Sequence, residues 1–286
     1  PEEEWEALQI VFATSQGDVR RNALSDFTNV MRNGKIAMKL PEGVELVNAR
    51  IADENDDVML LTDSGRAIRF PSTAVRVFKG RDSTGVRGIR LGKDDRVVSM
   101  AVIRHFEADP QERAAYLKQR RLMAGAVDEG EVDTDEEEAV EAGQLTPERY
   151  AAMSAAEDLI LTITSGGAGK LSSSHDYPVR GRGGQGVMAM DRAMRGGALI
   201  ASFPVVPGDQ IMLATSTGQS IRVPIDQISF RSRSAGGVRV FNTGKGEVVV
   251  SVARVAETED EDGVVEATAA VEADTVVEAD TNTTQD

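Results

Sequence analysis

Arginine and lysine side chains gather in loops that each end at a glycine followed by β-type residues. Four such loops recur, and they carry Arg32 before Gly34, Lys79 and Arg81 before Gly85, Arg180 and Arg182 before Gly186, and Arg231 and Arg233 before Gly237. Guanidinium groups bind phosphate through two parallel hydrogen bonds, and glycine lets backbone N–H groups approach a phosphate closely. The pattern predicts a surface that binds a phosphate backbone without reading bases. The predicted binding residues are Arg32, Lys35, Lys79, Arg81, Arg87, Lys170, Arg180, Arg182, Arg231 and Arg233.

Further bases lie in the strands that are expected just upstream of these loops. They are Arg20, Arg21, Arg66, Arg69, Lys170 and Arg222. Two roles are open for them: they join the same cationic surface, or they pair with nearby acidic side chains.

Two glycine-rich segments resemble nucleotide-binding motifs but lack essential parts of them. Arg180–Gly186 contains G-x-G-x-x-G, which binds a dinucleotide only between a strand and a helix, whereas the β-type residues Val187 and Met188 follow here. Gly166–Lys170 resembles a phosphate-binding loop, but Leu171 stands where a magnesium-binding hydroxyl is required. We therefore predict no cofactor-binding residues.

Residues suited to catalysis are scarce. The chain has no cysteine and two histidines, and no Ser/His/Asp arrangement is evident. Tyr116 and Tyr150 are expected to pack within helices, and Tyr177 to stack or to pack. The acidic run 53–57 is expected to be a solvated turn rather than a metal site. We predict no catalytic and no metal-binding residues.

The elements that position the cationic loops repeat four times along the chain. An apolar strand ending in a glycine turn occurs at 10–17, 58–65, 160–167 and 211–218, and a second strand follows each turn. The second glycine opens a predicted third strand, at 34–40 in the first copy, and an apolar fourth strand closes each unit. Units of about 50 residues with four strands are typical of propeller blades. A β-sandwich with coincidental turns is the alternative.

Net charge divides the chain into bodies and appendages. The formal net charge is −15, yet residues 8–103 carry 15 bases and 12 acids, and residues 158–256 carry 11 bases and 6 acids. The predicted organisation is an acidic leader at 1–7, blades at 8–52, 53–103, 158–206 and 207–256, an acidic insertion at 104–157, and a disordered acidic tail at 257–286. We expect the tail, and the acidic stretch 128–141, to compete with a polyanion for the cationic loops.

The insertion carries two helix-start signals. Asp109-Pro110-Gln111-Glu112 fits an N-cap with Pro at the first helical position and Glu at the third, and predicts a helix to about Ala124. Thr146-Pro147-Glu148 predicts a second helix to about Ala156. No apolar run is long enough to span a membrane, and the chain is expected in the cytoplasm.

The repeats closely resemble the C-terminal domain of the DNA gyrase A family. The resemblance rests on FATSQGDVRRNALSDF, NGKIAMKL, MLLTDSGRAIRF, STGVRGIRLGKDDRVVSM and QIMLATSTGQSIRV, and it covers about residues 8–103 and 158–256. It implies an all-β, propeller-like β-pinwheel in which blades exchange strands. Six blades are expected in the family, of which four are present. RGRGGQG at 180–186 is a partial echo of the family's box Q-R-R-G-G-x-G, which belongs to the first blade.

The resemblance also implies a function and partners. The module would wrap double-stranded DNA around a basic rim, as part of an ATP-dependent type II topoisomerase (an isomerase) that introduces negative supercoils. Its partners would be gyrase B and the rest of gyrase A in an A2B2 assembly on the nucleoid. ATP and magnesium would be used by the core and the partner subunit, with no cofactor in this chain. The alternatives are a propeller scaffold that binds no nucleic acid, or the related C-terminal module of topoisomerase IV.

Overall fold

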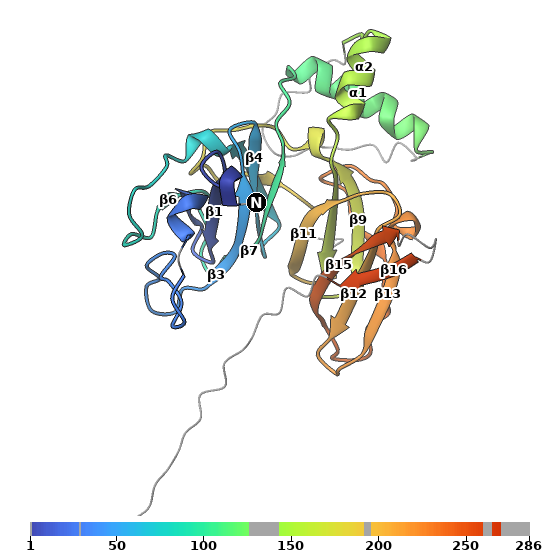
Figure 1. Cartoon of the computed structure of the whole chain (residues 1–286). Coiled ribbons are helices and arrows are strands. Elements are labelled where there is room, and N and C mark those ends of the chain that lie inside the picture. The colour runs from blue at the N-terminus through green and yellow to red at the C-terminus, as the bar shows by residue number, and fades with distance from the viewer. Residues whose placement is uncertain (1, 29, 126–142, 192–195, 260–264, 270–286) are drawn as a thin grey trace, which may run out of the picture.

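Four antiparallel sheets of four strands each make up the body of the molecule in the computed structural model, with two helices gathered at one end (Figure 1). The structure describes residues 2–28, 30–125, 143–191, 196–259 and 265–269. We number the sheets as blades 1 to 4 in chain order. The all-β, propeller-like fold class predicted from the repeats is thereby confirmed.

The strands of each blade follow in their spatial order. Blade 1 contains β3 (Leu46–Ala52), β1 (Gln9–Thr14), β2 (Asp18–Ala23) and β6 (Val86–Arg87). Blade 2 contains β7 (Val97–Arg104), β4 (Asp56–Thr62), β5 (Arg66–Pro71) and β10 (Val187–Met188). Blade 3 contains β11 (Leu199–Val205), β8 (Leu159–Thr164), β9 (Ala168–Ser173) and β14 (Val238–Arg239). Blade 4 contains β13 (Ser220–Pro224), β12 (Gln210–Thr215), β15 (Val249–Glu259) and β16 (Val265–Ala269).

Short 3-10 helices occur at the start of the chain and after each second strand. They are η1 (Glu2–Glu4), η2 (Leu24–Phe27), η3 (Ser72–Ala74), η4 (Ser174–Asp176) and η6 (Ile225–Gln227).

The third strand of each repeat pairs with the blade formed by the preceding repeat. Val86 of the second repeat lies opposite Val19 in blade 1, Val187 of the third opposite Ala67 in blade 2, and Val238 of the fourth opposite Gly169 in blade 3. The prediction that each third strand completes the blade of its own repeat was therefore wrong. The strand exchange that the family resemblance implied is confirmed, and it ties successive blades together through backbone hydrogen bonds.

The first repeat has no preceding repeat in this chain, and its predicted third strand is missing. Residues 34–40 form no strand, and Ile36 is 73% exposed. Blade 4 receives β16 beside β15 as its fourth strand instead. Residues 257–259 and 265–269 of the predicted disordered tail thus lie in strands, which contradicts the prediction for these positions. The other tail residues lie outside the described part.

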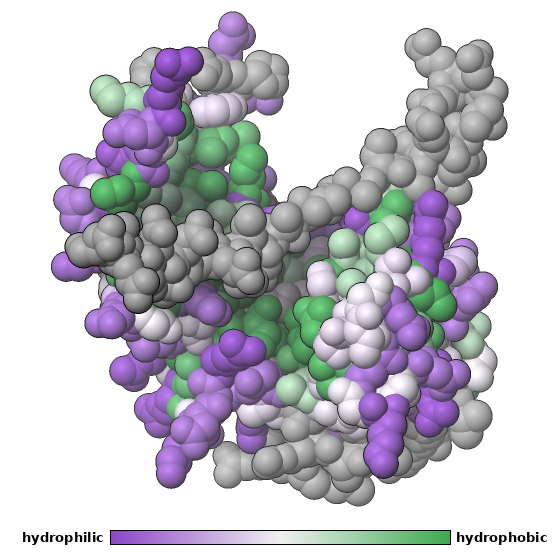
Figure 2. Space-filling view, turned by 90° about the horizontal axis from the view of Figure 1, so that it is seen from below, coloured by the Kyte–Doolittle hydropathy of each residue, from purple (hydrophilic) through white to green (hydrophobic). Residues whose placement is uncertain are grey.

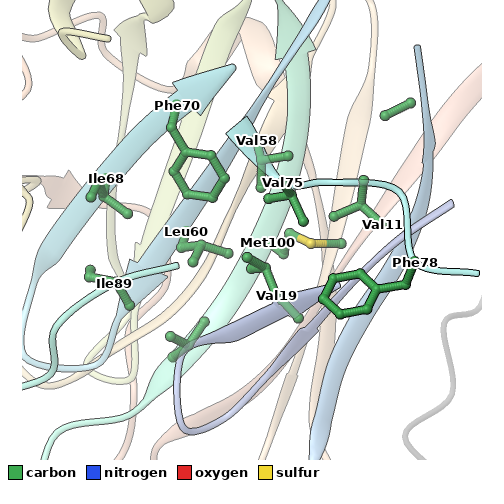
Figure 3. Packing of buried hydrophobic residues seen from close by; sticks show 13 residues of the cluster. Val11, Val19, Val58, Leu60, Ile68, Phe70, Val75, Phe78, Ile89 and Met100 are labelled. Atoms are coloured by element: carbon green, nitrogen blue, oxygen red, sulfur yellow. The ribbon is translucent and has the colours of Figure 1, made fainter. Parts of the chain in front are cut away.

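Apolar side chains fill the space between neighbouring blades. Between blades 1 and 2, Val11 and Val19 meet Leu60, Phe70 and Met100, all buried (Figure 3). Equivalent clusters lie between blades 2 and 3 and between blades 3 and 4. Burying one such side chain contributes about 1.5–3 kcal/mol, so stacking of blades, rather than any single sheet, stabilises the fold.

Glycine is required where the third strand starts. Gly85 and Gly186 have φ of +103° and +71°, a region that L side chains rarely adopt. A Cβ on Gly85 would lie 2.2 Å from the carbonyl oxygen of Val19, and one on Gly186 would lie 2.3 Å from that of Ala67. These glycines therefore allow the exchanged strand to come close to the receiving blade.

Two helices form the insertion between blades 2 and 3, as the helix-start signals predicted. Helix α1 (Pro110–Met123) begins with the predicted capping box of Asp109 and Glu112, and α2 (Pro147–Ala155) is capped by Thr146. Tyr116 is fully buried against Tyr150, with ring centroids 5.0 Å apart, and also meets the ring of His175. The packing roles predicted for both tyrosines are confirmed. The acidic stretch 128–141 lies outside the described residues.

Candidate nucleic-acid interface

The outer edge of each of blades 1 to 3 is built from the loop and short strand of the next repeat. The loop runs along the second strand of the receiving blade, with bridges from Val77 to Arg21, from Val179 to Arg69 and from Phe230 to Leu171. The following N–H groups, of Phe78, Arg180 and Arg231, donate to those same second-strand residues at 2.8 Å. Arg180 and Arg231 thus occupy matching places on successive blades, where the corresponding place on blade 1 holds Phe78.

Polar and apolar surfaces separate on the molecule. Seen from below, hydrophilic residues surround a middle region where hydrophobic residues show (Figure 2). A cavity of about 460 Å³ lies between the inner strands β3, β7, β11 and β15, and its lining is mostly apolar but includes Arg50 and Arg254.

Strand exchange brings exposed arginines of the second and third repeats together at the edges of blades 1 and 2. Arg87 and Arg90 of the second repeat and Arg180 and Arg182 of the third are all exposed or only partly covered. The backbone N–H of Arg90 donates to Gly184 O at 2.7 Å, and the guanidinium of Arg182 donates to Arg87 O at 3.0 Å. We call these four residues the arginine cluster. Such a concentration of positive charge on a convex edge attracts a polyanion.

Arg90 is the member of the arginine cluster that the sequence analysis missed. It follows the second glycine of its repeat by five residues and lies beyond Arg87, the last cation predicted in that repeat. The side-by-side position of Arg90 and the 180–186 loop follows from strand exchange, which residue spacing alone does not reveal.

Two predicted binding residues lie inside the protein. Lys170 is fully buried, and its Nζ donates to the carbonyl oxygens of Ser232, Arg233 and Ala235. Arg233 is 2% exposed, and its guanidinium donates to the carbonyls of Asp176 and Met188. The prediction that these two cations face a phosphate backbone was wrong, because their charges satisfy carbonyl groups of the loop between blades.

Second-strand arginines serve the same structural purpose. Arg20 donates to Ser83 O at 2.5 Å, Arg21 to Val75 O at 2.7 Å and Arg69 to Ser174 O at 2.7 Å, each acceptor belonging to the next repeat. All three are buried, and burial lowers the pKa of Arg20 and of Arg21. Of the six second-strand bases, only Arg66, half-buried, and Arg222, exposed, remain accessible.

The other predicted cations remain at the surface to different degrees. Arg32 and Lys79 are exposed. Lys35, Arg81 and Arg231 are half-buried, and Lys35 donates to Thr28 O at 2.9 Å. Among the predicted loop cations that the structure describes in the second to fourth repeats, the exposed ones lie on the edges of blades 1 and 2, whereas Arg231 on blade 3 is half-buried.

Tyr177 and Asp57 take part in packing, whereas Glu54 and Asn55 of the acidic run lie in an exposed turn, as predicted. Tyr177 is buried, which raises its pKa to about 12, so it packs rather than stacks on a ligand. Asp57 is also fully buried, hydrogen-bonded to Arg69 and His105 at 2.6 and 2.8 Å. The prediction of a solvated turn was wrong for this residue. No group of three or more acidic or histidine side chains is placed to hold a metal ion in the described ranges.

Fold and site together define a class of protein: strand-exchanged propeller repeats with a cationic outer edge. The model of the family "DNA gyrase C-terminal domain, beta-propeller" matches residues 9–53, 56–104, 158–206 and 209–256. The chain belongs to this family. Along the parts of the chain that the structure describes, no helix is both long and apolar enough to cross a membrane.

Two bacterial proteins are similar in sequence to most of this chain. The DNA gyrase A protein of Granulibacter bethesdensis is 49% identical over 269 residues, which cover 90% of this chain and 29% of that protein. The DNA gyrase A protein of Rickettsia bellii is 39% identical, over 91% of this chain and 28% of that protein. The chain thus spans less than a third of the length of these relatives.

Two solved structures share the fold. A DNA gyrase A C-terminal domain superposes with a TM-score of 0.61 at 19% identity, covering 87% of this chain and 66% of that chain. A C-terminal domain of DNA topoisomerase IV gives a TM-score of 0.63 at 18% identity, covering 87% and 62%. At these identities the likeness concerns the fold alone.

Proposed function

We propose that this chain binds and wraps duplex DNA along its outer edge, without reading sequence, as the C-terminal part of a DNA gyrase A protein. The arginine cluster is the single observation that carries the proposal. Phosphate contacts by exposed arginines supply sequence-independent affinity, and several spaced cations are needed because bending DNA costs several kcal/mol.

The wider role follows from the relatives' name. The parent would be an ATP-dependent type II topoisomerase that introduces negative supercoils, with the wrapped segment presented for strand passage. Gyrase B and the remainder of gyrase A would be the partners, in an A2B2 assembly on the nucleoid in the cytoplasm. ATP and Mg²⁺ would be used by the core and the partner subunit. This chain would contribute wrapping rather than catalytic residues.

A topoisomerase IV module is the second candidate, favoured by the fold similarity of its C-terminal domain. The named relatives favour gyrase, since DNA gyrase A sequences match this chain at up to 49% identity. Upstream sequence would separate the two: a complete box and two further blades indicate gyrase.

The test is DNA binding as a function of salt concentration. We would compare the chain with Arg87→Gln/Arg90→Gln/Arg180→Gln, which leaves Arg182 in place because its guanidinium also fastens the loop to Ala74 O. The control is Lys39→Gln/Lys93→Gln/Lys245→Gln, which removes three exposed charges elsewhere. Each lost phosphate contact should reduce the slope of log K against log salt by about 0.9.

We expect log K to fall steeply with log salt for the chain. The magnitude of this slope should be smaller by about 2–3 for the arginine variant and should change little for the control. Equal slopes for both variants would show that positive charge contributes to DNA binding wherever it lies on the surface, and that the arginine cluster is not a specific DNA-binding site. Absence of salt-dependent binding by the chain itself would overturn the proposed function.

A further inference from the structure

Helix α1 of the insertion lies beside the blade 3 edge, which carries few exposed cations among the residues that the structure describes. Two of the bases predicted there, Lys170 and Arg233, are buried, and Arg231 is half-buried. Arg239 is exposed but donates to Asn242. A polyanion passing from the arginine cluster towards blades 3 and 4 therefore meets less positive charge on the blades themselves.

The C-terminal part of α1 is held against the loop that forms the blade 3 edge. The guanidinium of Arg120 lies over the ring of Phe230, 4.6 Å from its centroid, and its Nε donates to Glu157 at 3.0 Å. Phe230 bridges to Leu171 in β9 and directly precedes Arg231. The helix is thus fixed beside the loop in which Arg231 is half-buried and Arg233 is buried.

The solvent-exposed part of this helix carries the base Lys118 together with the apolar side chains of Leu122 and Met123. Lys118 is exposed, and Arg121 is half-buried with its Nε donating to Leu117 O. The two residues are three apart, so they share one face, while Tyr116, Leu117 and Arg120 lie against the protein. Helix α1 contains four bases and one acid, and that acid, Glu112, is paired with Arg149 at 2.7 Å.

We propose that the Lys118–Arg121 face of α1 is a second DNA-binding surface, which contacts duplex phosphates beside blade 3 in place of Arg233, which the fourth repeat turns inward. The inference rests on the proposed function, since it assigns to the insertion a part in the same DNA path. The ammonium group of Lys118 and the guanidinium group of Arg121 would both bind phosphate oxygens and no base edges. The contact is therefore independent of base sequence.

The first test is the salt dependence of DNA binding by Lys118→Gln/Arg121→Gln, since glutamine keeps a good helix propensity. The matched control is Lys93→Gln/Lys245→Gln, which removes two exposed charges from loops between strands. We expect the salt dependence to weaken in the helix variant only, where the magnitude of the slope of log K against log salt should be smaller by about 2. Equal slopes for the chain and the helix variant would overturn the proposal.

The second test is independent of affinity. Because the chain has no cysteine, Lys118→Cys creates a single thiol that can be captured by duplex DNA bearing a disulfide-activated tether on its backbone. Cross-linking at Lys118→Cys, with little at the matched Lys93→Cys, supports the contact. Equal yields at the two sites, or none at Lys118→Cys, would overturn it, including the case in which an acidic segment of the protein occupies this face.

Failure of this inference is distinguishable from failure of the proposed function. If the Arg87/Arg90/Arg180 variant loses salt-dependent binding while the Lys118/Arg121 variant keeps it and no cross-link forms, DNA follows the blades alone. If the unmodified chain shows no salt-dependent DNA binding, the proposed function fails together with this inference.

Discussion

Arg69 and Asp57 form a fully buried ion pair, with Arg69 Nε 2.6 Å from Asp57 Oδ2. Arg69 also donates to the carbonyl oxygens of Ser174 in the third repeat and Arg104 at the end of β7, and His105 binds the other oxygen of Asp57. The pair therefore connects blade 2, the start of the insertion and the loop that carries Arg180.

Replacing Arg69 should destabilise the protein strongly. Arg69→Met leaves the Asp57 carboxylate buried without its guanidinium partner, and breaking a buried pair costs about 3–5 kcal/mol. Arg222→Met changes the equivalent position of the fourth repeat, where the side chain is exposed, and should change the free energy of unfolding by less than about 0.5 kcal/mol. Urea unfolding measures both, and similar losses for the two variants would contradict the assigned role of Arg69.

Lys170 should matter for stability and not for DNA. Lys170→Met removes the donor to three carbonyl oxygens and is expected to cost about 1–3 kcal/mol in the free energy of unfolding. Below the unfolding transition, the salt slope of DNA binding should match that of the unmodified chain, because the Lys170 charge is buried. A slope reduced by about 1 with normal stability would instead place Lys170 on the DNA path.

The second glycine of the third repeat should tolerate no side chain. Gly186→Ala puts a Cβ 2.3 Å from Ala67 O at positive φ, and should lose more than about 2 kcal/mol of stability as β10 is displaced. Gly34→Ala is the matched control, since Gly34 has φ +77° with nothing within 4 Å of an added Cβ. It should cost about 1–2 kcal/mol from backbone strain alone. Thermal unfolding compares the two, and an equal cost would mean that the close approach at Gly186 is unimportant.

His175 should make stability depend on pH. Burial lowers its pKa, and its Nε2 lies 2.8 Å from Met153 O, which the neutral ring can satisfy as a donor. As the pH falls, the unfolded chain binds a proton at this histidine that the folded chain does not bind. The contribution of His175 to the free energy of unfolding is therefore complete above pH of about 6.5 and is lost as the pH falls below that value. His175→Gln should flatten the fall of unfolding free energy between pH of about 7 and about 5, relative to the unmodified protein. Parallel curves for the two proteins would refute it.

Removing acidic residues at the C-terminus should strengthen DNA binding. A chain ending at Ala269 keeps β16 and lacks five acids. We expect tighter binding at moderate salt, because fewer negative charges compete for the cationic edge. A full-length chain with those five acids changed to their amides is the control for chain length and should behave like the truncated one. Unchanged affinity in both would end the competition hypothesis.

The sequence by itself determined the repeats, the first, second and fourth strands of each repeat, the glycine turns and both insertion helices, because hydrophobic periodicity, turn residues and caps are local properties. It did not determine which blade a third strand joins, since Val86 and Val187 pair across repeat boundaries. The blade that a third strand joins depends on which strand edges still have unpaired backbone N–H and C=O groups once the blades pack against one another.

Tertiary structure also decided which cations face solvent. Arg182 and Arg233 stand at matching places and donate to matching carbonyls, those of Ala74 and Arg87 and those of Asp176 and Met188. Arg182 nevertheless stays accessible, whereas Arg233 is covered and lies 3.9 Å from the Asp176 carboxylate, where the second repeat has Ala74. The residues next to Arg182 and Arg233 in the sequence do not predict a difference in their solvent exposure. That difference arises from the residues of other repeats that pack against each arginine.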